Sequence, residues 1–273
     1  GYLFGQYKRI RDSFDGGVLT GKGLSFGGSL TRSEATGYGL CYLTEEMLHC
    51  MKQESLQGKR VAISGSGNVA IFACQKAQEL GAKVITMSDS NGCIYDPEGI
   101  RLDVVKDIKL RRRGRIREYA QLVPGSEFRS DFRDLWSVPC DVALPCATQN
   151  EIDAETARRI VRGGAMALAE GANMPSTPAA IEVLREGGVL FAPAKAANAG
   201  GVAVSGLEMC QNSMRLAWTF DEVDQRLHQI MLDIFHNIYD ASVEYGVPGN
   251  LLDGANIAGF RKVADAMLAQ GVC

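Results

Sequence analysis

Short apolar runs alternate with helical patterns from residue 60 to residue 192. Such alternation is typical of a parallel sheet with helices packed on both faces. The runs that we predict as strands are 60–64, 83–88, 141–145, 165–169 and 189–192. The segments that we predict as helices between them are 67–80, 98–119, 153–163 and 177–186. The pattern therefore predicts a doubly wound α/β fold.

The pattern changes after Pro193, where no further strand is indicated. Amphipathic helices are predicted at 221–245 and 254–270. The first carries an apolar stripe with three- and four-residue steps, which is typical of a helix that faces a core. Its members are Val223, Leu227, Ile230, Ile234 and Ile238. Upstream of the sheet, Thr31 and Glu34 have the spacing of a capping box, which predicts a helix from there to about Met51.

The composition argues against several classes of protein. Hydrophobic residues make up 46% of the 273 residues and charged residues 22%, with a net charge of -3, so a nucleic acid partner is not favoured. No apolar run reaches the length of a membrane span, and the first residues lack the pattern of a signal peptide. We therefore expect a cytoplasmic protein with neither a membrane nor a nucleic acid partner. The start at Gly1 indicates a processed or truncated piece.

The cysteines and histidines give no metal motif. The eight cysteines contain no C-x-x-C pair, and several lie inside apolar runs, so reduced thiols are expected. Of the three histidines, His228 and His236 stand eight residues apart on a predicted helix, which is not a metal-ligand spacing. We therefore predict no metal.

The run "VAISGSGNVA" joins the first predicted strand to the following helix through G-x-G-x-x-A. In such a turn Gly65 permits the tight bend, Gly67 lets the backbone approach a pyrophosphate, and Ala70 lets helix and strand pack closely. An ordinary tight turn is the alternative. However, the second strand follows one helix later and ends in Asp89, near the distance expected for an acid that binds a ribose. The sequence therefore predicts a dinucleotide site.

The pattern alone leaves open which dinucleotide binds. Asp89 favours NAD, because a carboxylate repels a 2′-phosphate unless cations intervene. Such cations are present in "KLRRRGRIR", whose basic residues are Lys109, Arg111, Arg112, Arg113, Arg115 and Arg117. Guanidinium groups match phosphate oxygens well. A solvated basic helix end and a nucleic acid patch are the alternatives for this run.

A second glycine-rich segment, "GGVLTGKG", places Gly16, Gly21 and Lys22 at the spacing of a P-loop. However, Gly23 stands where a Ser or Thr would hold Mg²⁺, and no apolar strand precedes the segment. We therefore reject a P-loop.

Long motifs along the chain resemble those of glutamate dehydrogenases, chiefly the NADP-linked members of the hexameric bacterial type. They are "LSFGGSLTRSEATGYG", "SGSGNVA", "LPCATQNEID", "AEGANMPSTPAA", "APAKAANAGGVAVSGLEMCQNS" and "GANIAGFRKVADAML". The resemblance implies three parts. They are an inter-domain segment with a leading helix (1–52), a Rossmann-like dinucleotide-binding domain (53–199), and a hinge helix with returning helices that cross the hinge (200–273).

The resemblance also implies what each position does. The expected cofactor contacts are Thr36, Ser64, Gly65, Gly67, Asn68, Val69, Ser88, Asp89, Lys109, Arg112, Ala147, Thr148, Asn173 and Asn198. Thr36 and Asn68 would position the nicotinamide carboxamide, and Asn173 would contact the nicotinamide ribose. Four residues match the family's group for the 2′-phosphate, namely Ser88, Asp89, Lys109 and Arg112. Without the motif context, Asn and Thr at such positions would be turn or cap residues.

The substrate contacts implied by the resemblance are Asn198 and Ser205, the latter matching the hydroxyl that holds the side-chain carboxylate of glutamate. The expected reaction is the reversible oxidative deamination of L-glutamate to 2-oxoglutarate and ammonia with NADP(H), NAD being less favoured. The family's catalytic lysine and aspartate have no counterpart here, so we expect no catalytic residue in this chain and no activity from it alone. The alternatives are a dehydrogenase of the leucine, valine or phenylalanine type and a non-catalytic dinucleotide-binding fragment. A homo-oligomer is expected, a hexamer in the full-length family.

Overall fold

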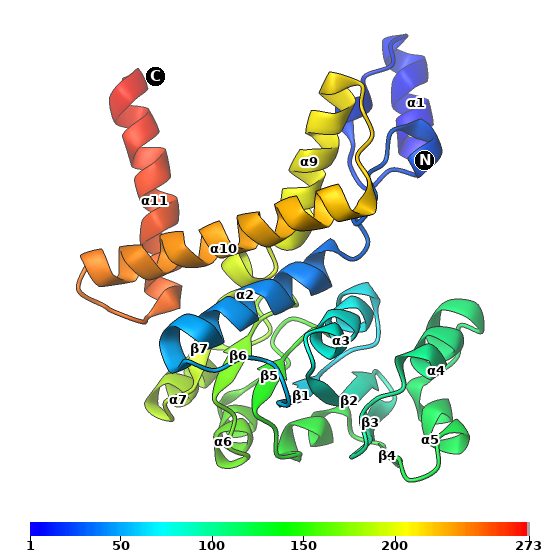
Figure 1. Cartoon of the computed structure of the whole chain (residues 1–273), viewed down its shortest axis with the longest axis vertical. Helices are drawn as coiled ribbons and strands as arrows, with labels where there is room; N and C mark the ends of the chain where they lie inside the picture. Colours follow the sequence, from blue (N-terminus) through cyan, green and yellow to red (C-terminus); the bar gives the residue numbers. More distant parts are fainter. Residues whose placement is uncertain (272–273) are drawn as a thin grey trace.

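The structure is a computed structural model that describes residues 1–271. Within them, seven strands form one sheet in the order β4-β3-β2-β1-β5-β6-β7 (Figure 1). The strands are β1 (Arg60–Ile63), β2 (Lys83–Asp89), β3 (Gly92–Tyr95), β4 (Glu127–Arg129), β5 (Val142–Leu144), β6 (Ala167–Ala169) and β7 (Leu190–Ala192). Each of the five predicted strands is present, and these five pair in parallel.

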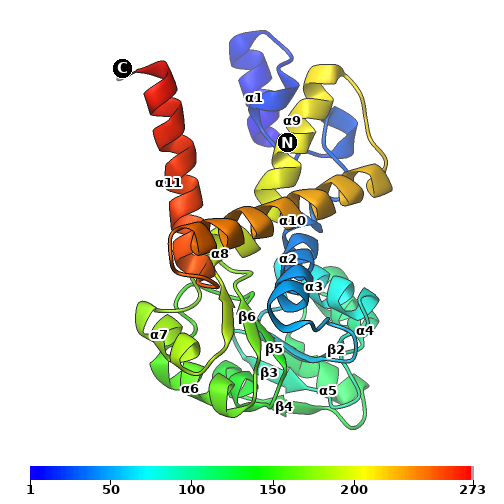
Figure 2. The same ribbon diagram turned by 60° about the vertical axis from the view of Figure 1, so that its left-hand side comes forward.

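Helices cover both faces of the sheet. Neighbouring residues of each strand point to opposite faces, so a strand that is apolar throughout needs a helix layer on each side to bury them. In β1, Val61 and Ile63 pack into a core shared with α2 (Ala35–Lys52) and α3 (Asn68–Glu79). Ala62 between them packs into a second core with α6 (Ala154–Arg162) and α7 (Pro178–Glu186). In Figure 2 these two helices lie on the opposite side of the strands from α2 and α3. The predicted doubly wound α/β fold is confirmed.

The remaining helices follow the sheet or connect its strands. Those after the last strand are α8 (Ala194–Ala197), α9 (Gly200–Met214), α10 (Phe220–Glu244) and α11 (Leu251–Gln270). At the other end of the chain, α1 (Tyr2–Arg11) lies beside α9, and both project away from the sheet, as does α11 (Figures 1 and 2). The 3₁₀ turns outside the segment described below are Gly16–Val18, Leu24–Phe26 and Phe132–Ser137.

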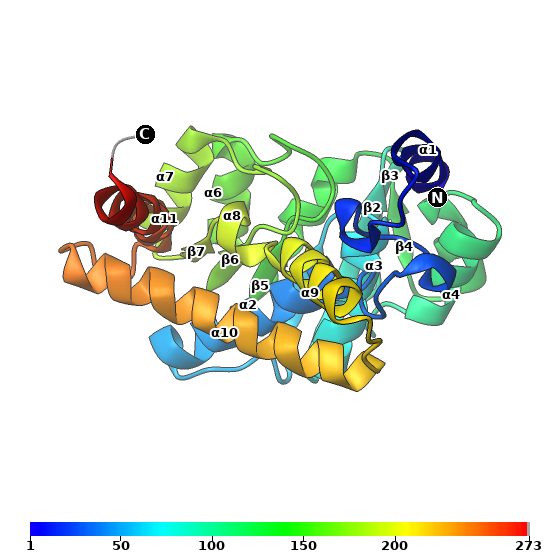
Figure 3. The ribbon, with the colours of Figure 1, turned by 90° about the horizontal axis from the view of Figure 1, so that it is seen from above.

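The buried face of α10 differs in its middle from the predicted stripe. Val223, Leu227 and Ile238 are buried as expected. Between them, however, the buried residues are Met231 and Phe235, whereas Ile230 and Ile234 are only partly buried. Because α10 packs on both α2 and α9, its neighbours select the buried face as much as its hydrophobicity does. Figure 3 shows α10 lying across these helices.

The segment 98–119 is not the single helix that we predicted. It contains α4 (Leu102–Lys106), a π-helical turn (Asp107–Arg111) and a 3₁₀ turn (Ile116–Glu118), and it leads into α5 (Tyr119–Leu122). Arg113 has a φ of 53°, and a side chain at Gly114 would collide with the carboxylate of Glu118. The strands β3 and β4 were also not predicted. They are short and pair antiparallel at the sheet edge. Although Cys93 and Ile94 of β3 are buried, they form too short an apolar run to predict a strand, and β4 is not buried.

The predicted capping box at the start of α2 is wrong. Thr31 has a φ of 67° and is buried, and its hydroxyl donates to the carbonyl oxygen of Phe220 at 3.3 Å. The helix begins at Ala35 instead, and Glu34 precedes it without a side-chain capping bond. A contact with the start of α10 therefore replaces the local hydrogen bond that the sequence spacing indicates.

Residues 1–271 bear on the predictions about membrane spans and about the cysteines. No helix there is both long and apolar enough to cross a bilayer. Seven cysteines have free thiols, as expected, namely Cys41, Cys50, Cys74, Cys93, Cys140, Cys146 and Cys210. The eighth, Cys273, lies outside the described residues.

Candidate functional site

The sheet changes its direction of winding between β1 and β5. The chain leaves β1 toward β2 on one side and leaves β5 toward β6 on the other, so the loops after the two strands diverge. Ligands of open α/β sheets bind in the crevice at such a switch point, beyond the carboxyl ends of the strands. Here that crevice is formed by adjoining cavities, which we call the switch-point cleft.

The glycine turn after β1 lies at the floor of this cleft. Gly65 has a φ of 85°, and a Cβ there would lie 3.0 Å from the carbonyl oxygen of Cys146. Gly67 precedes α3, and a Cβ there would meet no atom within 4 Å, so its backbone is open to the cleft. The N–H of Gly65 is already donated to the Ser88 hydroxyl at 2.8 Å. The donors left for an anion are therefore those of the first turn of α3, whose N–H groups have no partner within the helix.

Ser64 does not line the cleft. It is buried, and its hydroxyl donates to Glu151 Oε1 at 2.8 Å and accepts from the N–H of Cys146 at 2.9 Å. It thus ties the end of β1 to the loop after β5. Burial raises the pKa of Glu151 to about 7 against the opposing hydrogen bonds from Ser64 and from the backbone of Ala147, and its Oε2 has no partner among the described residues. We had not singled out Glu151 from the sequence.

One end of the cleft is a cavity of about 490 Å³ lined by predicted cofactor residues, namely Gly65, Gly67, Ser88, Asp89, Lys109, Ala147 and Thr148. Asp89 accepts hydrogen bonds from the backbone of Ile116 and Asn91, both at 2.9 Å, and from Lys109 Nζ at 3.1 Å. Burial alone would raise the pKa of Asp89, but these hydrogen bonds outweigh it and lower that pKa. Lys109 therefore partly neutralises the carboxylate that would repel a 2′-phosphate.

The basic run meets this cavity at a position that we had not selected. Arg112 does not line the cavity and instead pairs with Asp107 at 3.0 Å and with Glu118 at 3.3 Å. Arg115 donates to the hydroxyl of Ser90 at 3.2 Å, and Ser90 lines the cavity. The backbone bends at residues 113 and 114, where the helix is interrupted. Arg115, which follows this bend, therefore contacts a residue of the cavity lining, whereas Arg112 before it does not.

The other end of the cleft is a cavity of about 570 Å³, and Cys146, Ala147 and Thr148 line both ends. The predicted residues that line this second cavity are Thr36, Val69, Ala147, Thr148, Asn173, Asn198 and Ser205. Asn198 donates to the side-chain oxygen of Asn173 at 2.8 Å, which joins the loop after β6 to the loop before α9. Asn68 lines a neighbouring cavity together with Thr36 and Val69.

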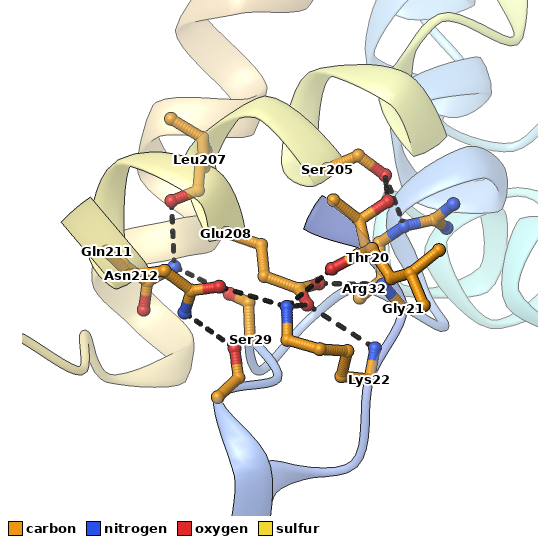
Figure 4. Close-up of polar contacts among 12 residues, drawn as sticks. Thr20, Gly21, Lys22, Ser29, Arg32, Ser205, Leu207, Glu208, Gln211 and Asn212 are labelled. Carbon is orange, nitrogen blue, oxygen red and sulfur yellow. Dashed lines mark hydrogen bonds and ion pairs between the residues drawn. The ribbon is translucent and has the colours of Figure 1, made fainter. Parts of the chain in front are cut away.

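Ser205 faces a cation that the sequence reasoning missed. Its hydroxyl accepts hydrogen bonds from Arg32 Nε at 2.9 Å and from the Thr20 hydroxyl at 3.0 Å (Figure 4). Arg32 lines the same cavity, and its guanidinium N–H groups other than Nε have no hydrogen bond to any of residues 1–271. This end of the cleft therefore offers a hydroxyl and a guanidinium, a pair suited to a carboxylate.

A buried ion pair joins the loop around Lys22 to Glu208, which follows Ser205 on α9. Lys22 Nζ lies 2.6 Å from Glu208 Oε1, and both side chains are almost inaccessible, at 2% and 0% exposed. Lys22 also donates to Asn212 at 2.9 Å, and the N–H of Gly21 donates to Glu208 at 2.9 Å (Figure 4). The loop that carries Thr20 is thereby fixed to α9. Lys22 points to Glu208, in agreement with our rejection of a P-loop.

The chain is similar to known amino-acid dehydrogenases. The family model for glutamate/leucine/phenylalanine/valine dehydrogenases matches residues 27–271. The whole chain aligns with the NADP-specific glutamate dehydrogenase of Helicobacter pylori strain J99 at 51% identity and with that of Escherichia coli K12 at 54%. It covers 62% and 60% of those proteins, so the chain spans about three fifths of the length of these curated relatives.

Solved structures give the same result. The crystal structure of glutamate dehydrogenase from Plasmodium falciparum superposes with a TM-score of 0.96 at 44% identity, over 100% of this chain and 59% of that one. The hetero-hexameric glutamate dehydrogenase of Thermus thermophilus, in a leucine-bound form, superposes with a TM-score of 0.88 at 25% identity, over 100% of this chain and 62% of that one.

Proposed function

Because the chain belongs to the glutamate/leucine/phenylalanine/valine dehydrogenase family, we propose that it is the cofactor-binding part of an NADP(H)-dependent glutamate dehydrogenase. The reaction would be the reversible oxidative deamination of L-glutamate to 2-oxoglutarate and ammonia. The observation that carries this proposal is the pairing of Ser205 with Arg32 at one end of a cleft whose other end holds the glycine turn. We also propose the division into segments 1–52, 53–199 and 200–273.

The residues present fit a dinucleotide. The open backbone at Gly67 and the free N–H groups at the start of α3 would receive the pyrophosphate. The proposed 2′-phosphate group consists of Ser88, Asp89 and Lys109 at the cavity and of Arg112 as an outer member, which pairs with Asp107 and Glu118. Arg115 is a further cation beside Ser90. NADP rather than NAD is supported by Lys109, which offsets the charge of Asp89, and by the NADP-specific relatives.

The nicotinamide end would hold the ring and the substrate against each other. Bound NADP would supply the acceptor for the hydride that leaves the glutamate Cα. Thr36 and Asn68 would orient the carboxamide, while Asn173 and Asn198, which already bond to each other, would hold the ribose side. Positioning of this kind lowers the barrier because the reacting atoms are aligned before the reaction.

Glutamate is favoured over an apolar amino acid by Arg32 and Ser205. Arg32 and Ser205 would bind the side-chain carboxylate, Arg32 through its charge and Ser205 as a hydroxyl donor. A leucine or valine side chain would leave the guanidinium without an anion, which is costly in a partly buried site.

A homo-hexamer of the full-length protein is supported by the hexameric Thermus thermophilus relative, whose own assembly is hetero-hexameric. Cytoplasmic location stays a prediction.

The first experiment is a titration of the 273-residue chain with NADPH and with NADH, followed by nicotinamide fluorescence at one ionic strength. NADPH is expected to bind at least about tenfold more tightly, since one phosphate–cation contact is worth about 1.4 kcal/mol or more. Binding of neither nucleotide would contradict the proposal.

The second experiment adds 2-oxoglutarate to the NADPH complex. Tighter NADPH binding that is lost in Ser205→Ala would support the glutamate reaction. The same response to 4-methyl-2-oxopentanoate alone would favour a leucine-type dehydrogenase. NADPH binding that no 2-oxo acid affects would favour a non-catalytic dinucleotide-binding fragment.

A further inference from the structure

Helices α2 and α10 lie side by side and run in the same direction (Figures 1 and 3). The ring of Tyr38 lies 6.3 Å from that of Phe220, and the ring of Tyr42 stacks on that of His228 at 4.3 Å between centroids. Residues 38, 42, 46 and 50 of α2 follow at four-residue steps, so they form one stripe along the contact with α10. The stripe begins with two aromatic rings and continues with Glu46 and Cys50.

His236 completes a cluster at this end of the stripe. Its Nε2 lies 2.9 Å from Glu46 Oε1, and the Cys50 thiol donates to the same oxygen at 3.2 Å. All three potential ligand atoms lie within 4.8 Å of one another. The Glu46 side chain is 19% exposed and that of His236 is 49% exposed, so solutes can reach the cluster.

These separations are close to those of a metal site. In a tetrahedral zinc site with bonds of about 2.0–2.3 Å, the distances between ligand atoms are about 3.3–3.6 Å. The two contacts of Glu46, at 2.9 Å and 3.2 Å, are shorter by a few tenths of an ångström. The ligand atoms of Cys50 and His236 also lie within 4.8 Å of each other, so rotations of the side chains could bring all three around one cation.

We propose that Glu46, Cys50 and His236 form a binding site for a divalent cation of the zinc class, which bridges α2 and α10. A thiolate together with an imidazole selects zinc over magnesium or calcium, which prefer oxygen ligands. Three protein ligands leave the fourth tetrahedral position to water. On binding, the Cys50 sulfur exchanges its proton for the metal, the proton passes to solvent, and His236 binds as the neutral imidazole.

The site is separate from the switch-point cleft. Thr36 lies in the first turn of α2 and Cys50 in the last, and the 14 residue steps from one to the other span about 21 Å at 1.5 Å per residue. The proposal therefore does not depend on which dinucleotide or substrate binds. It goes beyond our prediction of no metal, which considered only the spacing of His228 and His236 on one helix, whereas the proposed ligands lie on two helices.

The test is alkylation of the 273-residue chain with iodoacetamide, with and without Zn²⁺, followed by mass spectrometry of the cysteine peptides. Zn²⁺ is expected to slow modification of Cys50 by more than about tenfold, since the bound thiolate is no longer the free nucleophile. Cys210, which is also exposed, serves as the internal reference and should react at an unchanged rate. Mg²⁺ at the same concentration should protect neither.

Matched variants decide which residues bind. Cys50→Ser, Glu46→Gln and His236→Asn should each weaken Zn²⁺ binding by more than about tenfold, whereas Cys210→Ser should leave it unchanged. Co²⁺ should give a thiolate charge-transfer band that Cys50→Ser abolishes. Circular dichroism shows whether each variant folds. If His236→Asn does not fold, Cys50→Ser and Glu46→Gln decide whether the cluster binds Zn²⁺. Equal alkylation of Cys50 with and without Zn²⁺, or binding by Cys50→Ser and Glu46→Gln as tight as that of the unmodified chain, would overturn the proposal.

Discussion

The two ends of the switch-point cleft are built in different ways. The end near Asp89 is lined largely by two segments that are close in the chain, the glycine turn after β1 and the end of β2, with further residues from Lys109, Phe132 and the loop after β5. The end near Ser205 is formed by side chains from segments far apart, since Thr20 and Ser205 are separated by 185 residues. The first end depends on local turn geometry, whereas the second depends on how the chain termini pack. Four predictions compare these two dependences.

The largest effect is expected at the Ser205 end, from Lys22→Met. This change leaves the carboxylate of Glu208 buried without its cation, which costs about 3–5 kcal/mol in the free energy of unfolding. Denaturant unfolding monitored by circular dichroism measures the loss. The double variant Lys22→Met with Glu208→Leu should recover much of the stability, because no buried charge then remains. If Lys22→Met alone is as stable as the unmodified chain, this end does not depend on the ion pair.

At the Asp89 end, Gly65→Ala should cost about 2–3 kcal/mol of stability. A φ of 85° is strained for alanine, and its Cβ would press on the backbone of Cys146. The matched variant Gly67→Ala meets no protein atom, so it should leave unfolding unchanged while it weakens both NADPH and NADH. Unfolding curves and nicotinamide fluorescence separate the two effects. Equal loss of stability in both variants would contradict the assignment of a structural role to Gly65 and a cofactor-binding role to Gly67.

A smaller effect connects stability to pH through Glu151, beneath the same turn. Its pKa of about 7 in the folded chain exceeds the value of about 4.3 in an unfolded chain, so folding favours its protonated form. The corresponding stability is fully present below about pH 4.3 and is lost as the pH rises through about 7. From pH 5 to pH 8 the chain should lose about 2.5 kcal/mol relative to Glu151→Gln. Denaturant unfolding at several pH values measures this, and parallel pH profiles would contradict it.

The smallest effect concerns the choice of dinucleotide. Lys109→Gln should reduce the preference for NADPH over NADH by about tenfold, because Asp89 then lacks its cation beside the 2′-phosphate. Arg112→Gln is the matched control. Since Arg112 pairs with Asp107 and Glu118 outside the cavity lining, it should change the preference less. Competitive fluorescence titration gives both ratios. An equal or larger loss in Arg112→Gln would mean that its side chain turns to the cofactor on binding.

The sequence by itself determined the parallel strands, the glycine turn and the placement of Asp89 at the end of β2. These features depend on apolar runs and on residues close together in the chain, and a local pattern encodes them directly. The motifs of the resemblance also selected residues that meet in the cleft, such as Thr36, Asn173 and Ser205. Their roles remain proposals.

Only the tertiary structure decided which side chains meet across long separations. Arg32 donates a hydrogen bond to Ser205, and Lys22 pairs with Glu208. The Thr31 hydroxyl donates to the backbone at the start of α10 instead of capping α2. The zinc-class cluster belongs here too, since its ligands lie on two helices. No periodic pattern encodes such contacts, because each depends on the direction in which two distant elements cross. Packing of the two chain ends against each other and against α2 fixes that direction, and local propensity does not.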